Sequence, residues 1–344
     1  MSRELLNTLF VMTQGAYVRL DGDTLRVESE GKTISQVPVH HLGSVVLFGH
    51  AMMSSNALHR CAEDGRSVTF LDMNGRFKAR LVGPVSGNIL LRQAQYTAHA
   101  DENTRTEIAR CMVAGKLQNS RSVLMRASRE SKSEEHVKVL NAAVNHMAGL
   151  IVALPQLSNL EEIRGCEGHG AACYFGSFDK MILSQRTDFK FDGRNRRPPR
   201  DRINALLSFL YALVANDCRS ALEGVGLDPQ LGFLHSLRSG RPALALDLME
   251  EFRPVLAERL ALSMVNRKQI QADHFEERPG QSVMLNEDGR KAVLVAYQKR
   301  KQEEVSHPLL KTKVHLGLVP HLQARILARC VRREIDAYPP FMPR

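Results

Sequence analysis

The sequence predicts an α+β protein, with a small N-terminal β-rich domain followed by a larger, mostly α-helical domain. Short apolar runs separated by turn signals come first, and long helical periodicity follows. The composition is that of a folded chain: of 344 residues, 43% are hydrophobic and 24% charged, which excludes a mostly disordered protein. We expect the β-rich domain at 1–85, a linker and the start of the helical region at 86–100, and the helical domain at 101–344.

The β-rich part is predicted from alternating apolar residues and tight-turn dipeptides. Residues 17–20 and 24–27 flank Asp21-Gly22-Asp23 and predict a hairpin. The apolar runs 44–48 and 67–71 predict buried strands, and 54–64 suits a short helix between them.

The helical part begins after Gly83-Pro84, which marks the domain boundary. Residues 90–153 have few glycines or prolines and predict long helices. Ser158 and Glu161 have capping-box spacing and predict a helix through about Phe175.

Further along, Asp201 is a candidate N-cap for a helix with apolar residues at helical spacing. Another helical stretch is predicted over 242–265, and a mobile tail from about residue 337.

Charge indicates a polyanionic partner. The net charge is +10, and it is uneven: residues 1–90 hold nine basic and eight acidic residues, and the remainder holds 38 and 29. Nucleic acid is the commonest partner of such a chain, although many basic proteins bind none.

The cysteines and the apolar runs indicate the cellular compartment of the protein. The six cysteines are scattered and no apolar leader precedes them, so we expect reduced thiols in a cytoplasm. No uninterrupted apolar run approaches the roughly 18 residues of a membrane span, and we expect no membrane partner.

Two carboxylates suggest a metal site. Asp247 and Glu250 are three residues apart, so a helix places both on one face, which is otherwise apolar. Such a pair can bind a divalent ion; the alternative is a solvated acidic face. His235 precedes Arg238 and Arg241, and could be a ligand beside bound phosphate or an ordinary hydrogen-bonded histidine.

Glu167 lies among glycines and alanines, which allow close approach of a backbone or ligand; the alternative is a surface glutamate beside a tight packing seam. A zinc site at Cys166, His169 and Cys173 is rejected, because the C-x-x-C pair is missing. The sequence also lacks nucleotide-binding glycine motifs.

Four motifs occur in order: Glu-Gly-x-Gly-Ala-Ala at 167–172, an Arg-Pro-Pro run at 197–208, Asp-Pro-x-x-Gly-Phe-Leu-His at 228–235 with its two arginines, and Leu-Asp-Leu-Met-Glu-Glu-Phe-Arg-Pro at 246–254. Together they closely resemble the CRISPR-associated spacer-integration endonucleases. Asn7-Thr8-Leu9, Gly15-Ala16-Tyr17 and Asp21-Gly22-Asp23 resemble the form found in subtype I-C loci. The resemblance covers essentially the whole chain.

The resemblance implies an N-terminal dimerisation domain and a helical catalytic, DNA-binding domain. It implies a homodimer that works with a small ferredoxin-like companion and inserts short invader-derived duplexes at the leader end of a CRISPR array. By position, Glu167, His235 and Glu250 match the family's metal ligands and Asp247 an accessory acidic residue. A divalent ion there would support transesterification by a DNA 3′-hydroxyl, with Mg²⁺ or Mn²⁺ as candidates.

Phosphate contacts are expected from arginines and lysines near the motifs and in the basic loop 186–202. The candidates are Arg238, Arg241, Arg194, Arg196, Arg197, Arg200, Arg290, Lys291, Lys299, Arg300 and Lys301.

Three alternatives stay open. The chain could instead cut branched DNA, with water as the nucleophile, or be a DNA-binding scaffold without catalysis. An RNA-processing role is disfavoured, since there is no tryptophan and only 6% of residues are aromatic.

Overall fold

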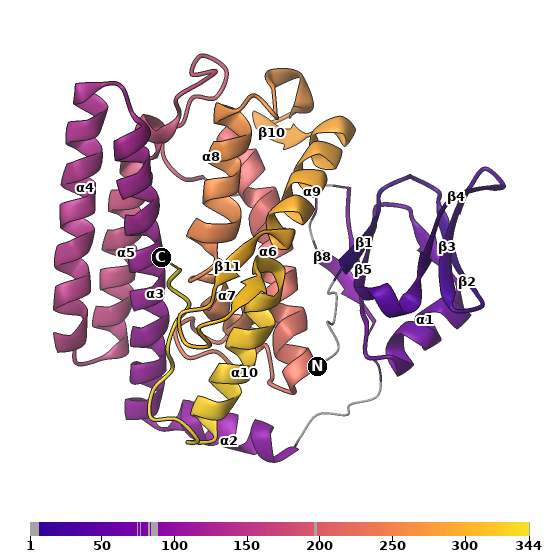
Figure 1. Ribbon diagram of the computed structural model, residues 1–344, viewed down its shortest axis with the longest axis horizontal. Helices are drawn as coiled ribbons and strands as arrows, with labels where there is room; N and C mark the ends of the chain where they lie inside the picture. Colours follow the sequence, from indigo (N-terminus) through magenta and orange to yellow (C-terminus); the bar gives the residue numbers. More distant parts are fainter. Residues whose placement is uncertain are drawn as a thin grey trace. The chain divides into compact units, whose positions relative to one another are not determined.

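The chain divides into two compact units, Met1–Ser86 and Gly87–Arg344. The structure is a computed structural model and describes residues 7–73, 75, 77–81, 83, 89–195 and 198–343. Figure 1 shows strands in the first unit and mostly helices in the second. The predicted α+β class is therefore confirmed.

The N-terminal unit contains two four-stranded sheets. In one sheet, three parallel strands are followed by an antiparallel edge strand: β1 (Asn7–Val11), β5 (Leu42–Phe48), β7 (Ser67–Leu71) and β8 (Phe77–Arg80). The order in the other sheet is β4 (Lys32–Pro38), β3 (Thr24–Ser29), β2 (Tyr17–Asp21) and β6 (Met52–Met53). A short 3₁₀ turn, η1 (Val39–His41), links β4 to β5.

The predicted hairpin is β2–β3, in which Val18 lies opposite Val27 and Leu20 opposite Leu25. Alternation directs Val18, Leu25 and Val27 into the core of this unit. The predicted short helix is α1 (Ser55–Glu63), and it begins where the Ser54 side chain accepts a hydrogen bond from the Ala57 amide.

The second unit is built mainly from helices. Its longer helices are α2 (Ile89–Ala100), α3 (Glu102–Glu130), α4 (Glu134–Ala153), α5 (Leu160–Gly176), α6 (Arg202–Val225), α7 (Ala243–Met249), α8 (Arg259–Asn266), α9 (Glu287–Gln302) and α10 (Val319–Val331). Shorter turns are η2 (Leu154–Gln156), η3 (Phe178–Met181), η5 (Ala272–His274), η6 (Leu316–Leu318) and the π-helical η4 (Arg253–Glu258). Two hairpins complete the unit: β9 (Phe275–Arg278) with β10 (Ser282–Leu285), and β11 (Glu304–Ser306) with β12 (Lys313–His315).

Helix starts follow local capping chemistry. Asp201 caps α6 as predicted, since its carboxylate accepts from the Asn204 amide. The predicted cap of α5 is wrong by one residue: the Asn159 side chain accepts from the Glu162 amide, and Glu162 in turn accepts from the Ser158 amide. Glu162 thus accepts from the residue before the N-cap and not from the Asn159 amide, so the hydrogen bonds are not the reciprocal pair of a capping box.

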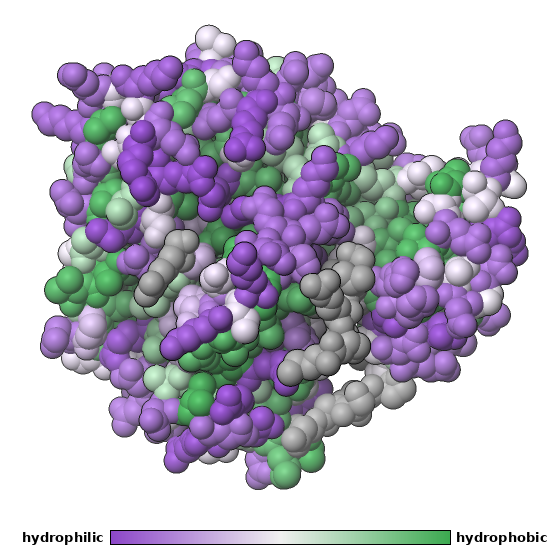
Figure 2. Space-filling model, viewed as in Figure 1, coloured by the Kyte–Doolittle hydropathy of each residue, from purple (hydrophilic) through white to green (hydrophobic). Residues whose placement is uncertain are grey.

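Helix α4 forms a layer with α3 and α5 (Figure 1). In the described part of the chain, Glu134–Gln156 is the one helical stretch long and apolar enough to cross a membrane by length and composition. Its inner face buries Leu140, Val144 and Met147, while Asn141 and Asn145 are exposed. This division is typical of an amphipathic helix that packs on protein. On the side of the protein drawn in Figure 2, most of the surface is hydrophilic.

The C-terminal segment is packed, so the predicted mobile tail is wrong for residues 338–341. Tyr338 and Phe341 are buried, and the Phe341 ring stacks on Phe252 with centroids 6.0 Å apart. The buried Glu251 carboxylate accepts hydrogen bonds from the Tyr338 hydroxyl and the Phe341 amide. The Asn119 amide group donates to the Glu251 and Phe341 carbonyls at 2.8 Å each.

We expect Glu251 to make folding stability depend on pH. Burial raises its pKa from 4.5 to about 7 against the opposing effect of its hydrogen bonds. As pH rises from 4.5 to 7, the unfolded chain releases this proton more readily than the folded protein does. The free energy of unfolding therefore falls over this range, by an amount of order 3 kcal/mol. Urea unfolding at pH 5 and pH 7.5 should show this fall, and Glu251→Gln should reduce it. Equal pH dependence in both proteins would contradict the expectation.

Candidate active site

Residues far apart in sequence meet in the helical unit. Glu167 comes from α5, His235 from the loop between α6 and α7, and Asp247 from α7. Glu250 ends α7, and Lys116 comes from the buried side of α3. The structure thus brings together all four predicted site residues, around a lysine.

Helix α5 approaches α3 closely because of its small residues. A Cβ atom at Gly170 would lie 2.3 Å from the Leu117 Cδ2 atom, so only a glycine fits without a shift. This close approach brings Glu167 into contact with Lys116, which neighbours Leu117 in sequence. Of the glycines around Glu167, Gly170 lies at this helix contact, whereas a Cβ atom at Gly165 or Gly168 would meet nothing within 4 Å.

Asp247 fixes the loop that carries His235. This fully buried carboxylate accepts from the amides of Phe233, Leu234 (2.9 Å) and His235 (2.8 Å). The loop passes close by, since a Cβ atom at Gly232 would lie 2.5 Å from Asp247 Oδ2. Asp247 therefore acts as the structural anchor of the loop.

The same carboxylate orients the His235 ring. His235 Nδ1 lies 2.6 Å from Asp247 Oδ1. Because the Asp247 carboxylate can only accept, Nδ1 is assigned as the donor, and Nε2 is the ring nitrogen that is left to face the cluster. Nε2 lies 3.8 Å from Glu250 Oε1. The free nitrogen of the ring thus faces the second carboxylate.

Lys116 lies between the two glutamates. Its ammonium group pairs with Glu167 and lies 2.6 Å from Glu250 Oε2. At this distance the ammonium group makes a charge-assisted contact with that buried oxygen, which favours the ionised carboxylate. Among the described residues, no group of three His, Cys, Asp or Glu side chains already converges as a metal site.

The charges around Glu250 hold it ionised. Burial would raise its pKa, but Arg253, Lys116 and His235 lower it to about 2. Arg253 lies 3.1 Å from Glu250 Oε1 and over the Tyr211 ring at 5.0 Å. Burial likewise lowers the pKa of Lys116, and the two glutamates more than compensate, so its pKa is raised.

Sequence reasoning missed Lys116 and Arg253. Lys116 has a signal that could have found it: it shares the inward face of α3 with Met112, Val113 and Ser120, where a lone lysine needs a buried partner. Arg253 follows Glu250 by three residues and so lies near it in a helical turn.

The predicted phosphate contacts divide into free and engaged side chains. Arg238, Arg200, Lys291 and Lys299 are exposed. Arg196 and Arg197 lie outside the described residues. Arg241 lies 3.4 Å from the Ser236 hydroxyl, and Arg300 pairs with Glu303.

Three of the side chains predicted to contact phosphate instead make contacts within the protein. Arg290 is buried and donates to the Leu285 carbonyl at 2.6 Å. Lys301 is buried and lies 2.8 Å from Asp217. Arg194 donates to the Asn204 side chain at 2.5 Å and lies over the Tyr211 ring. These side chains are corrected to structural roles.

The rejected zinc motif does not converge. Cys166 Sγ lies 3.9 Å from the Leu150 carbonyl and Cys173 Sγ 3.8 Å from the Ala143 carbonyl, so both face α4. Small apolar packing accounts for these two cysteines.

Comparison with known proteins now adds to the geometry. The family model "CRISPR associated protein Cas1" matches residues 9–299. "CRISPR-associated endonuclease Cas1 1" of Moorella thermoacetica is 55% identical over 340 residues, covering 99% of each chain. A solved casposase bound to integration product has a TM-score of 0.82 and 22% identity, over 96% of this chain and 93% of that one. A Cas6-RT-Cas1–Cas2 complex has the same TM-score at 23% identity, over 98% of this chain and 36% of that one.

Proposed function

The chain belongs to the CRISPR-associated Cas1 family, and we propose that it is a metal-dependent DNA endonuclease and integrase of CRISPR adaptation. It would join the 3′-hydroxyl ends of short invader-derived duplexes to the leader-proximal repeat. The observation that supports this most is the meeting of Glu167, Glu250 and the Asp247-oriented His235 in one partly buried cluster around Lys116.

The donor set fits a divalent ion. Two carboxylates and one imidazole nitrogen are ligands that Mn²⁺ accepts and Mg²⁺ tolerates. The Glu250 carboxylate is buried, and a cation, the Lys116 ammonium, already lies 2.6 Å from its Oε2 atom. Glu167, His235 and Glu250 would hold the ion once Lys116 withdraws. Bound there, it would polarise the phosphoryl oxygen and stabilise developing alkoxide charge.

One phosphodiester bond forms and one breaks in this reaction, so their number does not change. The 3′-oxygen of the incoming strand bonds to a repeat phosphorus, the bond from that phosphorus to the repeat's own 3′-oxygen breaks, and a proton passes to the leaving oxygen. Asp247 holds the His235 ring so that Nε2 keeps its direction throughout. Exposed Arg238 and the neighbouring Arg241 are placed in the His235 loop, where they would bind DNA phosphates.

The wider setting belongs to the same proposal. We infer a cytoplasmic prokaryotic protein of the subtype I-C form, which forms a homodimer through its N-terminal unit and works with a small ferredoxin-like companion. The resemblance of the N-terminal motifs supports the subtype. The likeness of this fold to a chain solved in a Cas1–Cas2 complex is compatible with the companion.

A strand-joining gel tests the proposal. Purified protein, with and without the companion, is mixed with a labelled 3′-hydroxyl duplex and a supercoiled plasmid containing leader and repeat, in Mn²⁺, Mg²⁺ or EDTA. We expect label to enter the plasmid with a divalent ion, and Glu167→Gln to lower this at least 100-fold, because a metal-binding carboxylate is lost.

The matched control is Glu135→Gln, an exposed glutamate in the first turn of α4, which should join strands at the normal rate. Cutting of branched DNA without joining would favour the nuclease alternative. DNA binding with no reaction under any condition would favour the scaffold and contradict the proposal.

A further inference from the structure

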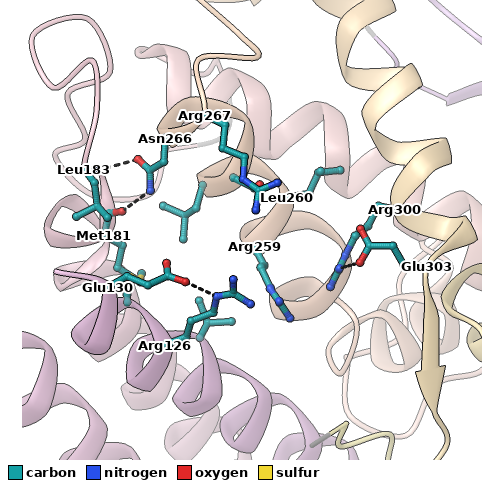
Figure 3. A pocket seen from close by; sticks show the side chains of 14 residues that line it. Arg126, Glu130, Met181, Leu183, Arg259, Leu260, Asn266, Arg267, Arg300 and Glu303 are labelled. Carbon is teal, nitrogen blue, oxygen red and sulfur yellow. Dashed lines mark hydrogen bonds and ion pairs between the residues drawn. The ribbon is translucent and has the colours of Figure 1, made fainter.

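A cavity of about 230 Å³ lies away from the catalytic cluster, between the C-terminal part of α3, the segment after η3, α8 and the end of α9 (Figure 3). Its apolar wall includes Val123, Met181, Leu183 and Leu260. Lys116 and Arg126 are ten residues apart on α3, which is about 15 Å along the helix axis. A group in this cavity is therefore not the group that reacts at Glu167 and Glu250.

Four arginines line the cavity: Arg126, Arg259, Arg267 and Arg300. Figure 3 shows the Arg259 side chain between those of Arg126 and Arg300, all three bordering the same open space. Such a gathering of one charge is unfavourable unless an anion is bound or acidic side chains balance it.

Acidic side chains balance only half of this charge. Arg126 lies 2.7 Å from Glu130 and Arg300 pairs with Glu303. Neither Arg259 nor Arg267 has a carboxylate partner among the described residues, and the cavity lining contains no further acid. The lining thus has four guanidinium groups against two carboxylates.

Arg259 is the arginine of this group on which burial and the neighbouring charges act most strongly. Burial lowers its pKa most, the nearby Arg300 and Arg126 lower it further, and Glu303 and Glu130 oppose this only in part, so that the pKa is about 10. A bound anion would remove this repulsion, and a guanidinium that is partly buried and unpaired is suited to bidentate contact with an oxyanion.

We propose that this cavity is a second anion site, which binds a phosphate group through Arg259, with Arg126 and Arg300 on either side of it and Arg267 elsewhere in the lining. The phosphate could belong to a free organic phosphate or to a DNA strand. The apolar wall would contact the carbon-rich part of the phosphate ester. This site is separate from the proposed integration chemistry. Only the possibility that its phosphate belongs to a DNA strand rests on the proposed function.

The first measurement is calorimetric titration of the full chain with inorganic diphosphate. We expect saturable binding to wild type and at least 10-fold weaker binding to Arg259→Gln. Arg325→Gln is the matched control, because this exposed arginine of α10 does not line the cavity and its replacement changes the net charge equally. Glu167→Gln should bind diphosphate as wild type does, so the result is independent of the catalytic proposal.

Fluorescence anisotropy with oligonucleotides then distinguishes the sources. If Arg259→Gln weakens binding of 5′-phosphorylated but not 5′-hydroxyl strands, the site takes a strand end. If it weakens both equally, relative to Arg325→Gln, the site takes an internal phosphate; diphosphate binding with unchanged DNA affinity indicates a free phosphate. Equal diphosphate and DNA affinities for wild type and Arg259→Gln would overturn the proposal. Thermal unfolding of Arg259→Gln verifies folding, and we expect no loss of thermal stability without ligand because repulsion is removed.

Discussion

Replacing Asp247 by asparagine should lower Mn²⁺ affinity and the strand-joining rate by roughly 10- to 100-fold. The carboxylate accepts from three backbone amides and from His235 Nδ1. An asparagine has one oxygen and one NH₂ group. Its NH₂ group would face N–H groups that now donate to the carboxylate, and those hydrogen bonds would be lost. The His235 ring would then lose its fixed direction toward Glu250. Isothermal titration with Mn²⁺ and the strand-joining gel measure the two effects.

Asp201→Asn is the matched control for this change. Asp201 also accepts a backbone amide, at the start of α6, where asparagine caps a helix about as well as aspartate does. We therefore expect Asp201→Asn to keep the metal affinity of wild type and only Asp247→Asn to lose it. Mn²⁺ binding by Asp247→Asn as tight as that of wild type would contradict the role given to Asp247.

The fold was predictable where a local rule is sufficient. The hairpin β2–β3 follows from alternation around a tight turn, and Ser54 and Asp201 cap helices as their chemistry requires. The packed C-terminal segment was not predictable in this way. Its consecutive prolines indicate an end of regular structure, whereas its burial depends on Glu251, a residue 87 positions earlier than Tyr338.

The site shows the same division. Helical spacing placed Asp247 and Glu250 on one face, and the motif resemblance selected Glu167 and His235. Spacing could not show that Asp247 would anchor a loop while Glu250 faces the cluster. Nor could it bring Lys116 to Glu167, 51 residues away, because that contact depends on helix packing at Gly170. Arg290 and Lys301 illustrate the converse, since a basic run along a helix includes its buried side.

Replacing Lys116 by methionine should destabilise the metal-free protein by about 3–5 kcal/mol, the usual result of removing one partner of a buried ion pair. Lys116 is the cation between Glu167 and Glu250, and methionine keeps the length of the side chain without its charge. Arg253 and the His235 ring would remain beside Glu250. Urea unfolding in EDTA measures the loss.

The same variant tests whether the lysine holds the place of a divalent ion. If it does, Mn²⁺ should restore much of the stability lost in Lys116→Met and bind more tightly than to wild type, because no ammonium must first be displaced. Lys301→Met is the matched control: this lysine is equally buried but pairs with Asp217 alone, so Mn²⁺ should not rescue it. If Mn²⁺ stabilises wild type and Lys116→Met by the same amount, the two cations do not compete, and the metal lies elsewhere than between Glu167 and Glu250.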